Sequence, residues 1–245
     1  MLTSAGLQLI ALITMLIDHI GAFLMGDDIV MRLIGRIAMP LFCFMLAEGF
    51  LHTKSREKRL RYFERLIIFA FISQFAFDLV HFASAGNQIV DLPRYLGSGA
   101  IGYKLSLNVL FTLTTGFAAM ALLEYGGYAI ICLPILPLIA SALNMDYGAF
   151  GVLMIIGFYL VSKYLSGESR RVLRWLGYIF VLFSITTAHV AIRDNSRQLF
   201  AIVAIFPILF YNGKLGKRLP KWFGYVFYPA HLLAIAIIAF TTNIA

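Results

Sequence analysis

Long apolar runs, each near the length of a membrane-crossing helix, follow one another along almost the whole chain. A helix needs about 20 predominantly apolar residues to cross the hydrocarbon core of a bilayer. By that measure the sequence predicts nine spans, at 5–25, 29–51, 61–82, 104–124, 126–143, 147–165, 172–193, 197–211 and 221–243. The expected fold is therefore all-α, a polytopic membrane helical bundle that occupies residues 1–245 as a single domain.

The eighth segment is the weakest of the nine. Its apolar part runs from Leu199 to Tyr211, which is too short for a full crossing unless Arg197 lies at the membrane interface. A re-entrant segment is the alternative here, and total counts of eight or ten crossings stay open.

Composition supports a membrane protein and excludes several other classes. Hydrophobic residues make up 61% of the chain and charged residues 13%, against roughly a quarter charged in soluble domains. So little charge cannot cover a globule in water, which excludes a soluble enzyme, a secreted disulfide scaffold and a disordered chain. The two cysteines, Cys43 and Cys132, each lie inside an apolar run without metal-ligand spacing, so no metal is expected.

The basic residues predict the orientation of the bundle. The net charge is +8, and 14 of the 20 Lys and Arg residues fall in three clusters, within 54–65, 163–174 and 214–221. With a cytoplasmic N-terminus and nine spans, all three clusters face the cytoplasm, and five basic residues face outward: Arg32, Arg94, Lys104, Arg193 and Arg197. Such asymmetry follows the positive-inside rule, so the charge indicates topology and no nucleic acid partner is expected.

Ionisable residues inside the predicted spans are the first candidates for function, because a charge in hydrocarbon costs several kcal/mol. Asp18 and His19 lie towards the outer end of the first span, and Arg36 lies at similar depth in the antiparallel second span. A purely structural Asp18–Arg36 ion pair is one interpretation. His19 is singled out as the catalytic candidate because a histidine accepts a proton near neutral pH.

More polar residues gather at the same depth and predict a polar cavity that opens outward. They come from four further spans: Asp78, Asn108, Asp146, Tyr147, His189 and Arg193. In the last span, Tyr228 and a proline precede His231, which is expected near the middle of the membrane. At the cytoplasmic side, Glu48 and His52 share a helix face beside the first basic cluster, for which topology and anionic lipid are the simplest explanation.

An ordered set of short motifs resembles the TraX family across nearly the whole chain. The first two are IALITMLIDHIG at 10–21 and RLIGRIAMPLF at 32–42. The set continues with AEGF at 47–50, HT at 52–53, Arg65, ISQ at 72–74, FD at 77–78, LNVLFTL at 107–113, DYGAFGV at 146–152, YNGK at 211–214 and FYPAHL at 227–232.

The resemblance implies an integral acetyltransferase of the bacterial inner membrane that uses acetyl-CoA. The named member of that family N-acetylates the pilin of F-type conjugative pili. The family is also similar to membrane acyltransferases of surface sugars, which carry an essential histidine late in the first span, as His19 is placed, and a tyrosine–histidine pair in a late span, as Tyr228 and His231 are. The arginine of those enzymes near the start of the first span has no counterpart, because the first basic residue here is Arg32.

The expected mechanism follows from that resemblance and from the residues. His19 takes a proton from an acceptor amine or hydroxyl, or forms an acetyl-histidine intermediate. Asp18 orients or balances the site, and Arg36 or Asn108 stabilises the oxyanion, with Asp78, Asp146, Tyr147, Tyr228 and His231 around the substrate. The donor phosphates are expected at the inner face, on Arg56, Arg59, Arg61, Arg65 and Lys214 beside Glu48 and His52. The acceptor is a pilin or a surface glycan.

Two other functions fit the same polar residues. A proton-coupled secondary transporter would use Asp18, His19 and Asp78 as a relay, although no inverted repeat is visible in the sequence. A non-catalytic assembly factor that holds a pilin would explain the apolar bulk, but not the concentration of charged groups at one depth.

Overall fold

A computed structural model of the chain describes residues 1–93, 106–217 and 220–242. Two basic residues expected at the outer side, Arg94 and Lys104, and the expected start of the fourth span lie outside these ranges. The described part is helical, and its β-type pairing is limited to isolated bridges between Leu2 and Tyr211 and between Leu107 and Met145. The all-α prediction is confirmed.

The helices follow the predicted order. The α-helices are α1 (Ser4–Phe23), α2 (Ile29–Gly35), α3 (Ala38–His52), α4 (Arg56–Ser84), α6 (Val109–Tyr125), α7 (Ile135–Ala142), α8 (Gly148–Tyr164), α9 (Arg171–Arg193), α10 (Ile205–Leu209) and α11 (Lys221–Thr242). Short 3-10 helices join them: η1 (Ile89–Asp91), η2 (Gly127–Cys132), η3 (Glu168–Arg170) and η4 (Ser196–Ala204).

Each of the nine predicted segments is found as helix, but their lengths differ. Among the described residues, five are long and apolar enough to cross a membrane: Ser4–Phe23, Ile29–His52, Arg56–Ser84, Glu168–Arg193 and Trp222–Thr242. The other four have between 10 and 17 residues. Large apolar side chains such as Phe71 on α4 and Phe180 on α9 are exposed, as expected of a surface that lipid covers.

The second span is not the continuous helix that the sequence predicted. It breaks between α2 and α3 at Arg36 and Ile37, where the backbone N–H groups donate to Leu33 and Ile34, three residues back. Pro40 explains the break, because its ring would clash with the carbonyl of Arg36, four residues earlier. The break places Arg36 at the junction of α2 and α3, within the predicted second span.

The eighth segment also departs from a regular α-helix. Residues Ser196–Ala204 form a nine-residue 3-10 helix, η4, and the five residues of α10 continue it. Runs of 3-10 helix beyond three or four residues are uncommon, and they often mark strain or a functional role. At about 2 Å per residue in η4 and 1.5 Å in α10, the segment reaches roughly 26 Å, slightly less than the hydrocarbon thickness.

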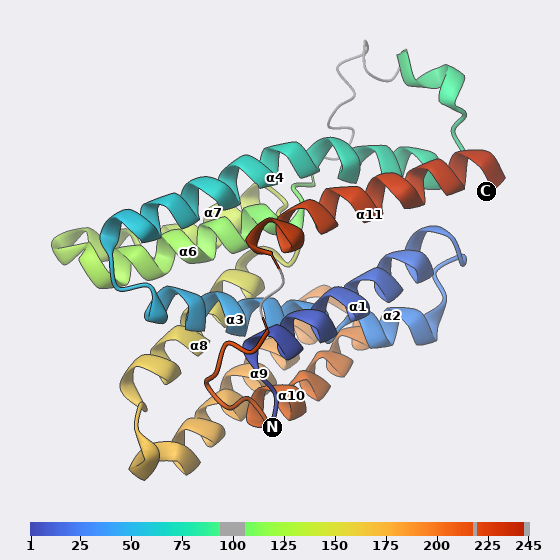
Figure 1. The fold of residues 1–245 in the computed structure, drawn as a ribbon. Coiled ribbons are helices and arrows are strands. Elements are labelled where there is room, and N and C mark those ends of the chain that lie inside the picture. The colour runs from blue at the N-terminus through green and yellow to red at the C-terminus, as the bar shows by residue number, and fades with distance from the viewer. Residues whose placement is uncertain (94–105, 218–219, 243–245) are drawn as a thin grey trace.

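The bundle is organised around α3, nine of whose 15 residues are buried. This helix packs on α1, α6, α8 and η4, and its rings Phe44 and Phe50 meet aromatic neighbours edge to face. Figure 1 shows α4 and α11 side by side along one edge, α1 to α3 through the middle and α8 to α10 on the other side. The α1–α2 connection and the C-terminus lie towards one end, and the start of α4 and the α8–α9 connection towards the other.

The first residues of the chain are fixed to a late connection. Leu2 N donates to Phe210 O at 2.8 Å, and Asn212 N donates to Leu2 O at 2.9 Å. Ser4 N and Ala5 N, at the start of α1, donate to the oxygens of Lys214 and Leu215. The start of α1 and the connection before α11 therefore lie together at the predicted cytoplasmic side.

Glycines allow α6, α8 and α9 to approach one another closely. A Cβ at Gly116 of α6 would overlap Ile155 of α8, and one at Gly157 of α8 would lie 2.7 Å from Val181 Cγ1 of α9. Small residues at such contacts are typical of membrane helices, because they let backbones pack tightly.

We expect Gly116→Ala to lower the thermal stability of the purified protein, because the added methyl overlaps Ile155 and overpacking costs about 1–3 kcal/mol. Gly6→Ala in α1 is the matched control, since its Cβ would meet Leu2 Cδ2 at an ordinary 3.5 Å. Both changes replace a helical glycine by alanine, so helix propensity affects them alike. Equal melting temperatures for the two variants would contradict the packing argument.

Candidate functional site

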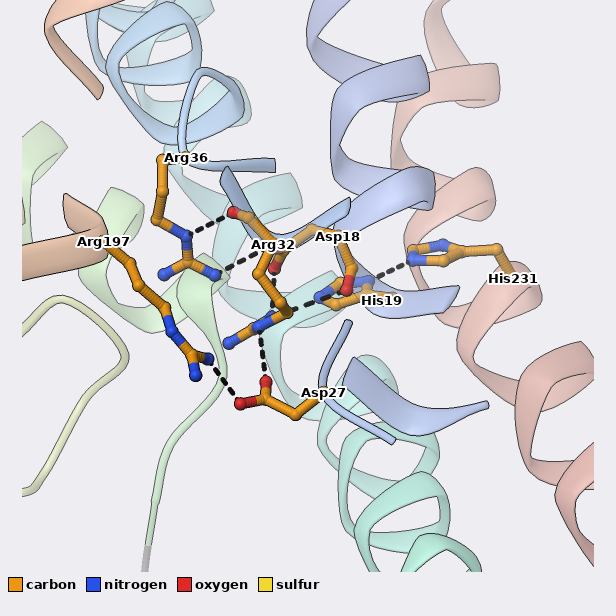
Figure 2. A network of polar contacts seen from close by, with 7 residues as sticks. All are labelled: Asp18, His19, Asp27, Arg32, Arg36, Arg197 and His231. Atoms are coloured by element: carbon orange, nitrogen blue, oxygen red, sulfur yellow. Dashed lines mark hydrogen bonds and ion pairs between the residues drawn. The ribbon is translucent and has the colours of Figure 1, made fainter. Parts of the chain in front are cut away.

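Two histidines, one from α1 and one from α11, form a hydrogen-bonded pair inside the bundle (Figure 2). His19 Nδ1 lies 2.7 Å from His231 Nε2, and the rings stack with centroids 4.9 Å apart. His231 Nδ1 lies 2.7 Å from the backbone oxygen of Phe227. Because a carbonyl oxygen only accepts, His231 Nδ1 carries the proton, and Nε2 of the neutral ring accepts. His19 Nδ1 must therefore be the donor to His231.

This tautomer leaves the lone pair of His19 on Nε2. No described residue forms a hydrogen bond with that nitrogen, and the rings of Phe23 and Tyr228 flank the imidazole at 5.8 and 6.2 Å. A neutral imidazole with one nitrogen fixed as donor and the other free is arranged as a proton acceptor. The pair thus holds His19 in the protonation state that a general base requires.

Asp18, the neighbour of His19, pairs with two arginines of the second span (Figure 2). Its Oδ2 lies 2.7 Å from Arg32 Nη1 and its Oδ1 lies 2.7 Å from Arg36 Nη2. Arg36 Nε also donates to the backbone oxygen of Arg32 at 3.2 Å, across the bend. Asp18 and Arg36 are buried, so this is a desolvated charge cluster and not a surface pair.

The cluster continues outward to a half-exposed acid. Arg32 Nε lies 3.1 Å from Asp27 Oδ1, and Arg197 Nη1 pairs with Asp27 Oδ2. The hydrogen bond from Arg197 holds the pKa of Asp27 below its ordinary value. The resulting chain, Arg36–Asp18–Arg32–Asp27–Arg197, contains three guanidinium groups and two carboxylates, so it carries one excess positive charge.

Local geometry explains how two adjacent residues reach different partners. Successive residues on a helix point about 100° apart, so Asp18 faces α2 while His19 faces α11. Gly35 admits the carboxylate, since a Cβ there would overlap Asp18. Gly21 likewise allows α1 to approach Met31 of α2. The two glycines bring the helices close enough for the double ion pair.

A polar pocket of about 260 Å³ opens on the predicted outer side, next to Arg36. Its lining comes from the connections before α6 and α8, the end of α9 and the start of η4: Arg36, Ser106, Asn144, Met145, Asp146, Tyr147, Gly148, His189, Arg193, Asn195 and Gln198. We call it the outer pocket. It joins Arg36 of the charge cluster to groups from four other parts of the chain.

The backbone of the α7–α8 connection is unusual where it lines the outer pocket. Asn144, Tyr147 and Gly148 have φ values of 48°, 61° and 45°. A positive φ is uncommon for an aromatic residue and costs free energy that the surrounding structure must supply. Thr112 Oγ1 donates to the backbone oxygen of Asp146 and so holds this connection to α6. Burial raises the pKa of the Asp146 side-chain carboxyl.

A second pocket, of about 380 Å³, lies at the predicted cytoplasmic end, between the start of α1, the end of α3 and the connection before α11. We call it the inner pocket. Its polar side chains are Ser4, Glu48, His52, Tyr211 and Lys214, and its apolar lining includes Leu7 and Phe44. Three of the expected donor-binding residues, Glu48, His52 and Lys214, thus share one pocket.

The four arginines expected to bind the donor lie instead along α4. Arg59 is buried: it donates to Phe50 O at 3.2 Å and to the Tyr125 hydroxyl, and it stacks over the Phe50 ring. Arg61 pairs with Glu57 on the surface. Arg56 and Arg65 lie over tyrosine rings, of Tyr125 and Tyr62 respectively. The contacts of Arg56 and Arg59 tie α4 to α3 and α6, whereas the contacts of Arg61 with Glu57 and of Arg65 with Tyr62 lie within α4.

Comparison with known proteins decides the family. The family model described as "TraX protein" matches residues 4–239, almost the entire chain. The chain belongs to the TraX family.

Two curated relatives extend this result. "Probable fimbrial assembly protein FimC, serogroup H1" of Dichelobacter nodosus is 28% identical over 242 residues, which cover 92% of this chain and 91% of that protein. An uncharacterized protein of Rickettsia prowazekii (strain Madrid E) is 31% identical over 154 residues, which cover 62% of this TraX-family chain and 53% of the relative. No solved structure matches the chain.

The expected oxyanion donor Asn108 is engaged within the fold. Its Nδ2 donates to Ala70 O at 2.8 Å and to Gln74 Oε1 at 2.9 Å, and its Oδ1 caps α6 by accepting from Leu110 N. Both amide hydrogens are used, so in this structure Asn108 has no free N–H for an oxyanion. Asp78 accepts from Gln74 Nε2 at 2.9 Å, and neither Asp78 nor Asn108 lines the outer pocket.

The other expected substrate residues divide between the outer pocket and the surroundings of the His19–His231 pair. Asp146 and Tyr147 line the outer pocket together with His189 and Arg193, whereas His231 lies behind His19 and Tyr228 is buried beside both histidines. Within the described ranges, no group of three or more His, Cys, Asp and Glu side chains is placed to hold a metal ion.

Sequence reasoning missed several partners in this TraX-family chain. The sequence predicts Arg32 and Arg197 only as outward basic residues, whereas in the structure they join Asp18 and Asp27 in one charge chain. The sequence analysis gives no expectation for Gln198, which is buried at the outer pocket. Arg197 and Gln198 lie in the weakest predicted span, where a polar pair inside an apolar run was the available signal.

Proposed function

We propose that this protein is an integral membrane acetyltransferase of the bacterial inner membrane. It moves an acetyl group from cytoplasmic acetyl-CoA to an acceptor amine or hydroxyl at the outer side. The observation that carries the proposal is the His231–His19 pair, which leaves a free lone pair on His19 Nε2. Because placing ionisable side chains at this depth in a membrane costs free energy, such residues are candidates for a functional role, and a general base is a role that this pair fits.

The reaction balances with this chain's own groups. His19 Nε2 removes the proton from the acceptor N–H or O–H as the nitrogen or oxygen bonds to the thioester carbonyl carbon. The tetrahedral intermediate then collapses, the carbon–sulfur bond breaks, and the proton on His19 passes to the departing sulfur. The products are the acetylated acceptor and CoA with a free thiol, and His19 returns to its starting tautomer.

Arginine guanidinium groups are the stabilising groups for the oxyanion. Arg32 and Arg36 lie around Asp18, adjacent to His19 in sequence, and the charge chain carries one excess positive charge. A negative oxygen that forms beside them balances that excess in a medium of low dielectric constant, where such an interaction is strong.

The inner pocket is the proposed entry site of the donor. Its position at the cytoplasmic end and its Lys214 side chain, which has no ion-pair partner among the described residues, suit the phosphates of CoA. Leu7 in the pocket and His19 are twelve residues apart on α1, which corresponds to about 18 Å. The pantetheine arm must therefore run along α1 for the thioester to reach His19.

A non-catalytic role in pilus assembly is the second candidate, because the name of the Dichelobacter relative refers to fimbrial assembly. In that role the protein would hold a membrane partner, and His19 would be dispensable. The two functions differ in whether acetyl-CoA is bound and consumed.

We expect acetyl-CoA to raise the melting temperature of the protein purified in nanodiscs, because a ligand that binds the native state stabilises it, by about 2.7 kcal/mol at 100 times its Kd. The same preparation should release free thiol slowly, which a thiol-reactive dye detects. Lys214→Glu should weaken the stabilisation, since it places a negative charge at the inner pocket.

Lys217→Glu is the matched control for that experiment, because Lys217 belongs to the same connection and does not line the pocket. Folded protein that shows neither stabilisation nor thiol release would rule out the acetyltransferase and favour the assembly role. If the two lysine variants weakened the stabilisation equally, the proposal that acetyl-CoA binds in the inner pocket would be wrong.

A further inference from the structure

The outer pocket is polar to an unusual degree for a cavity in a membrane protein. Of its eleven lining residues, Met145 alone has a purely apolar side chain. Ligand pockets are ordinarily lined mostly by apolar side chains with a few polar groups. The reverse composition suits a small ligand that forms hydrogen bonds over most of its surface.

The charges that face the outer pocket favour a negative group. Arg36 uses Nε and Nη2 within the charge cluster, and no described residue bonds to its Nη1. Arg193 has neither an ion pair nor a hydrogen bond within the described part of the chain. Against these two guanidinium groups stands one carboxyl, Asp146, whose pKa burial raises; the remaining titratable side chains are His189 and Tyr147.

Gln198 gives a second, independent indication of a ligand. The residue is 2% exposed and lines the outer pocket, and its Oε1 has no hydrogen-bond partner among the described residues. Leaving a buried amide oxygen unpaired costs about 1–3 kcal/mol, so such an atom in a native structure calls for a missing donor. A hydroxyl group of a ligand would supply that donor.

We propose that the outer pocket binds the acceptor and that the acceptor is an acidic sugar, whose carboxylate pairs with Arg36 and Arg193 and whose hydroxyl donates to Gln198. This inference rests on the proposed acetyltransferase function and specifies its substrate class. The acetyl group would then form an ester with a sugar hydroxyl.

Hydroxyl groups both donate and accept, which matches a lining of amides, hydroxyls and a carboxyl. Asn144, Asn195 and Gln198 provide three amides, and Tyr147 and Ser106 two hydroxyls. A peptide amino terminus would bring a positive charge towards two arginines, and its side chains would need apolar surface. The lining therefore favours a sugar acid over the amino terminus of a pilin.

The test is a binding measurement on the full-length protein in nanodiscs without acetyl-CoA. The probes are D-galacturonate and D-glucuronate, their neutral counterparts D-galactose and D-glucose, and triglycine amide as a cationic amino terminus. We expect one or both acids to bind about 10-fold to 100-fold more tightly than the matching neutral sugar, the range of a hydrogen bond to a charged group.

Two variants separate the contributions of charge and hydrogen bond. Arg193→Gln should reduce the affinity for the acid to that of the neutral sugar. Gln198→Leu should lower the affinity for the acid and for the neutral sugar about 10-fold or less. Arg174→Gln, at the other end of α9, is the matched control and should change nothing. Gln198 Oε1 has no protein partner to lose, so its replacement should not unfold the protein.

Several results would overturn the inference: no binding of either acid, equal affinity for acids and neutral sugars, unchanged acid binding in Arg193→Gln, or tighter binding of triglycine amide. The His19→Ala variant should bind the acids as the wild type does, because binding needs no general base. Thiol release without binding of either sugar acid would therefore refute only the proposal that the acceptor is an acidic sugar. Binding of a sugar acid without acetyl-CoA turnover would refute only the proposed acetyltransferase function.

Discussion

Acetyl transfer should fall by at least about 100-fold when His19 is replaced by alanine, because a positioned general base contributes about 10²- to 10⁴-fold. Nε2 of His19 has no described partner, so its removal leaves no other group in that place to accept the proton. The measurement is acetyl-CoA-dependent labelling of the acceptor or, without an acceptor, the release of free thiol from acetyl-CoA. The variant must first be shown to be folded and inserted.

His231→Phe is the informative companion to His19→Ala. Phenylalanine keeps the ring that stacks on His19 and removes the nitrogen that accepts from Nδ1. His19 is then free to adopt the other tautomer, so we expect kcat to fall on the order of 10-fold to 100-fold with little change in KM. A wild-type rate in His19→Ala would contradict the proposed role of His19 as general base. An equal loss of inserted protein in both variants would indicate that the His19–His231 pair is structural.

Asp18→Ala is expected to lower the stability of the bundle by about 3–5 kcal/mol, the cost of leaving a buried charge unpaired. Asp18 pairs with Arg32 and Arg36 at 2.7 Å each, and among the described residues no other carboxylate forms an ion pair with Arg36. Thermal unfolding of the detergent-purified protein, followed by size-exclusion chromatography, measures the effect.

Asp27→Ala is the control for Asp18→Ala, because Asp27 also pairs with two arginines but its side chain is 50% exposed. Exposed ion pairs contribute about 0–1 kcal/mol, so this variant should remain close to the wild type. Asp18→Leu combined with Arg36→Leu should be more stable than Asp18→Ala, since it removes one of the unpaired charges. Similar losses from Asp18→Ala and Asp27→Ala would mean that Asp18 is hydrated.

Much of the fold followed from the apolar pattern. The nine segments appear in the predicted places because span length is set by the bilayer and each span buries its own backbone hydrogen bonds. The divergence of Asp18 and His19 followed from helix geometry, and the Asp18–Arg36 pair from their shared depth. The break at Arg36 was not predicted, although Pro40, four residues later, was a signal for it.

The partners across the bundle did not follow from the sequence. His19 and His231 are 212 residues apart, and their contact depends on α11 packing against α1 and α4, which the length of a span does not determine. Arg32 appeared to be an interfacial residue until the close approach at Gly35 and Gly21 turned it towards Asp18. The 3-10 geometry of η4, which orients Arg197 and Gln198, leaves no clear signal in an apolar run.

The long separation of His19 and His231 has a consequence for synthesis at the ribosome. Asp18 finds Arg32 and Arg36 within 18 residues, so the costly charges are neutralised as soon as α1 and α2 emerge as a hairpin. The histidine pair closes only when the last helix is made, roughly 10 to 40 s later at 5–20 residues per second. The pairing of Leu2 with Tyr211 is delayed in the same way. Nascent and truncated chains can therefore neutralise the charges of Asp18 and Arg36 early, but they lack the His19–His231 pair until α11 has been made.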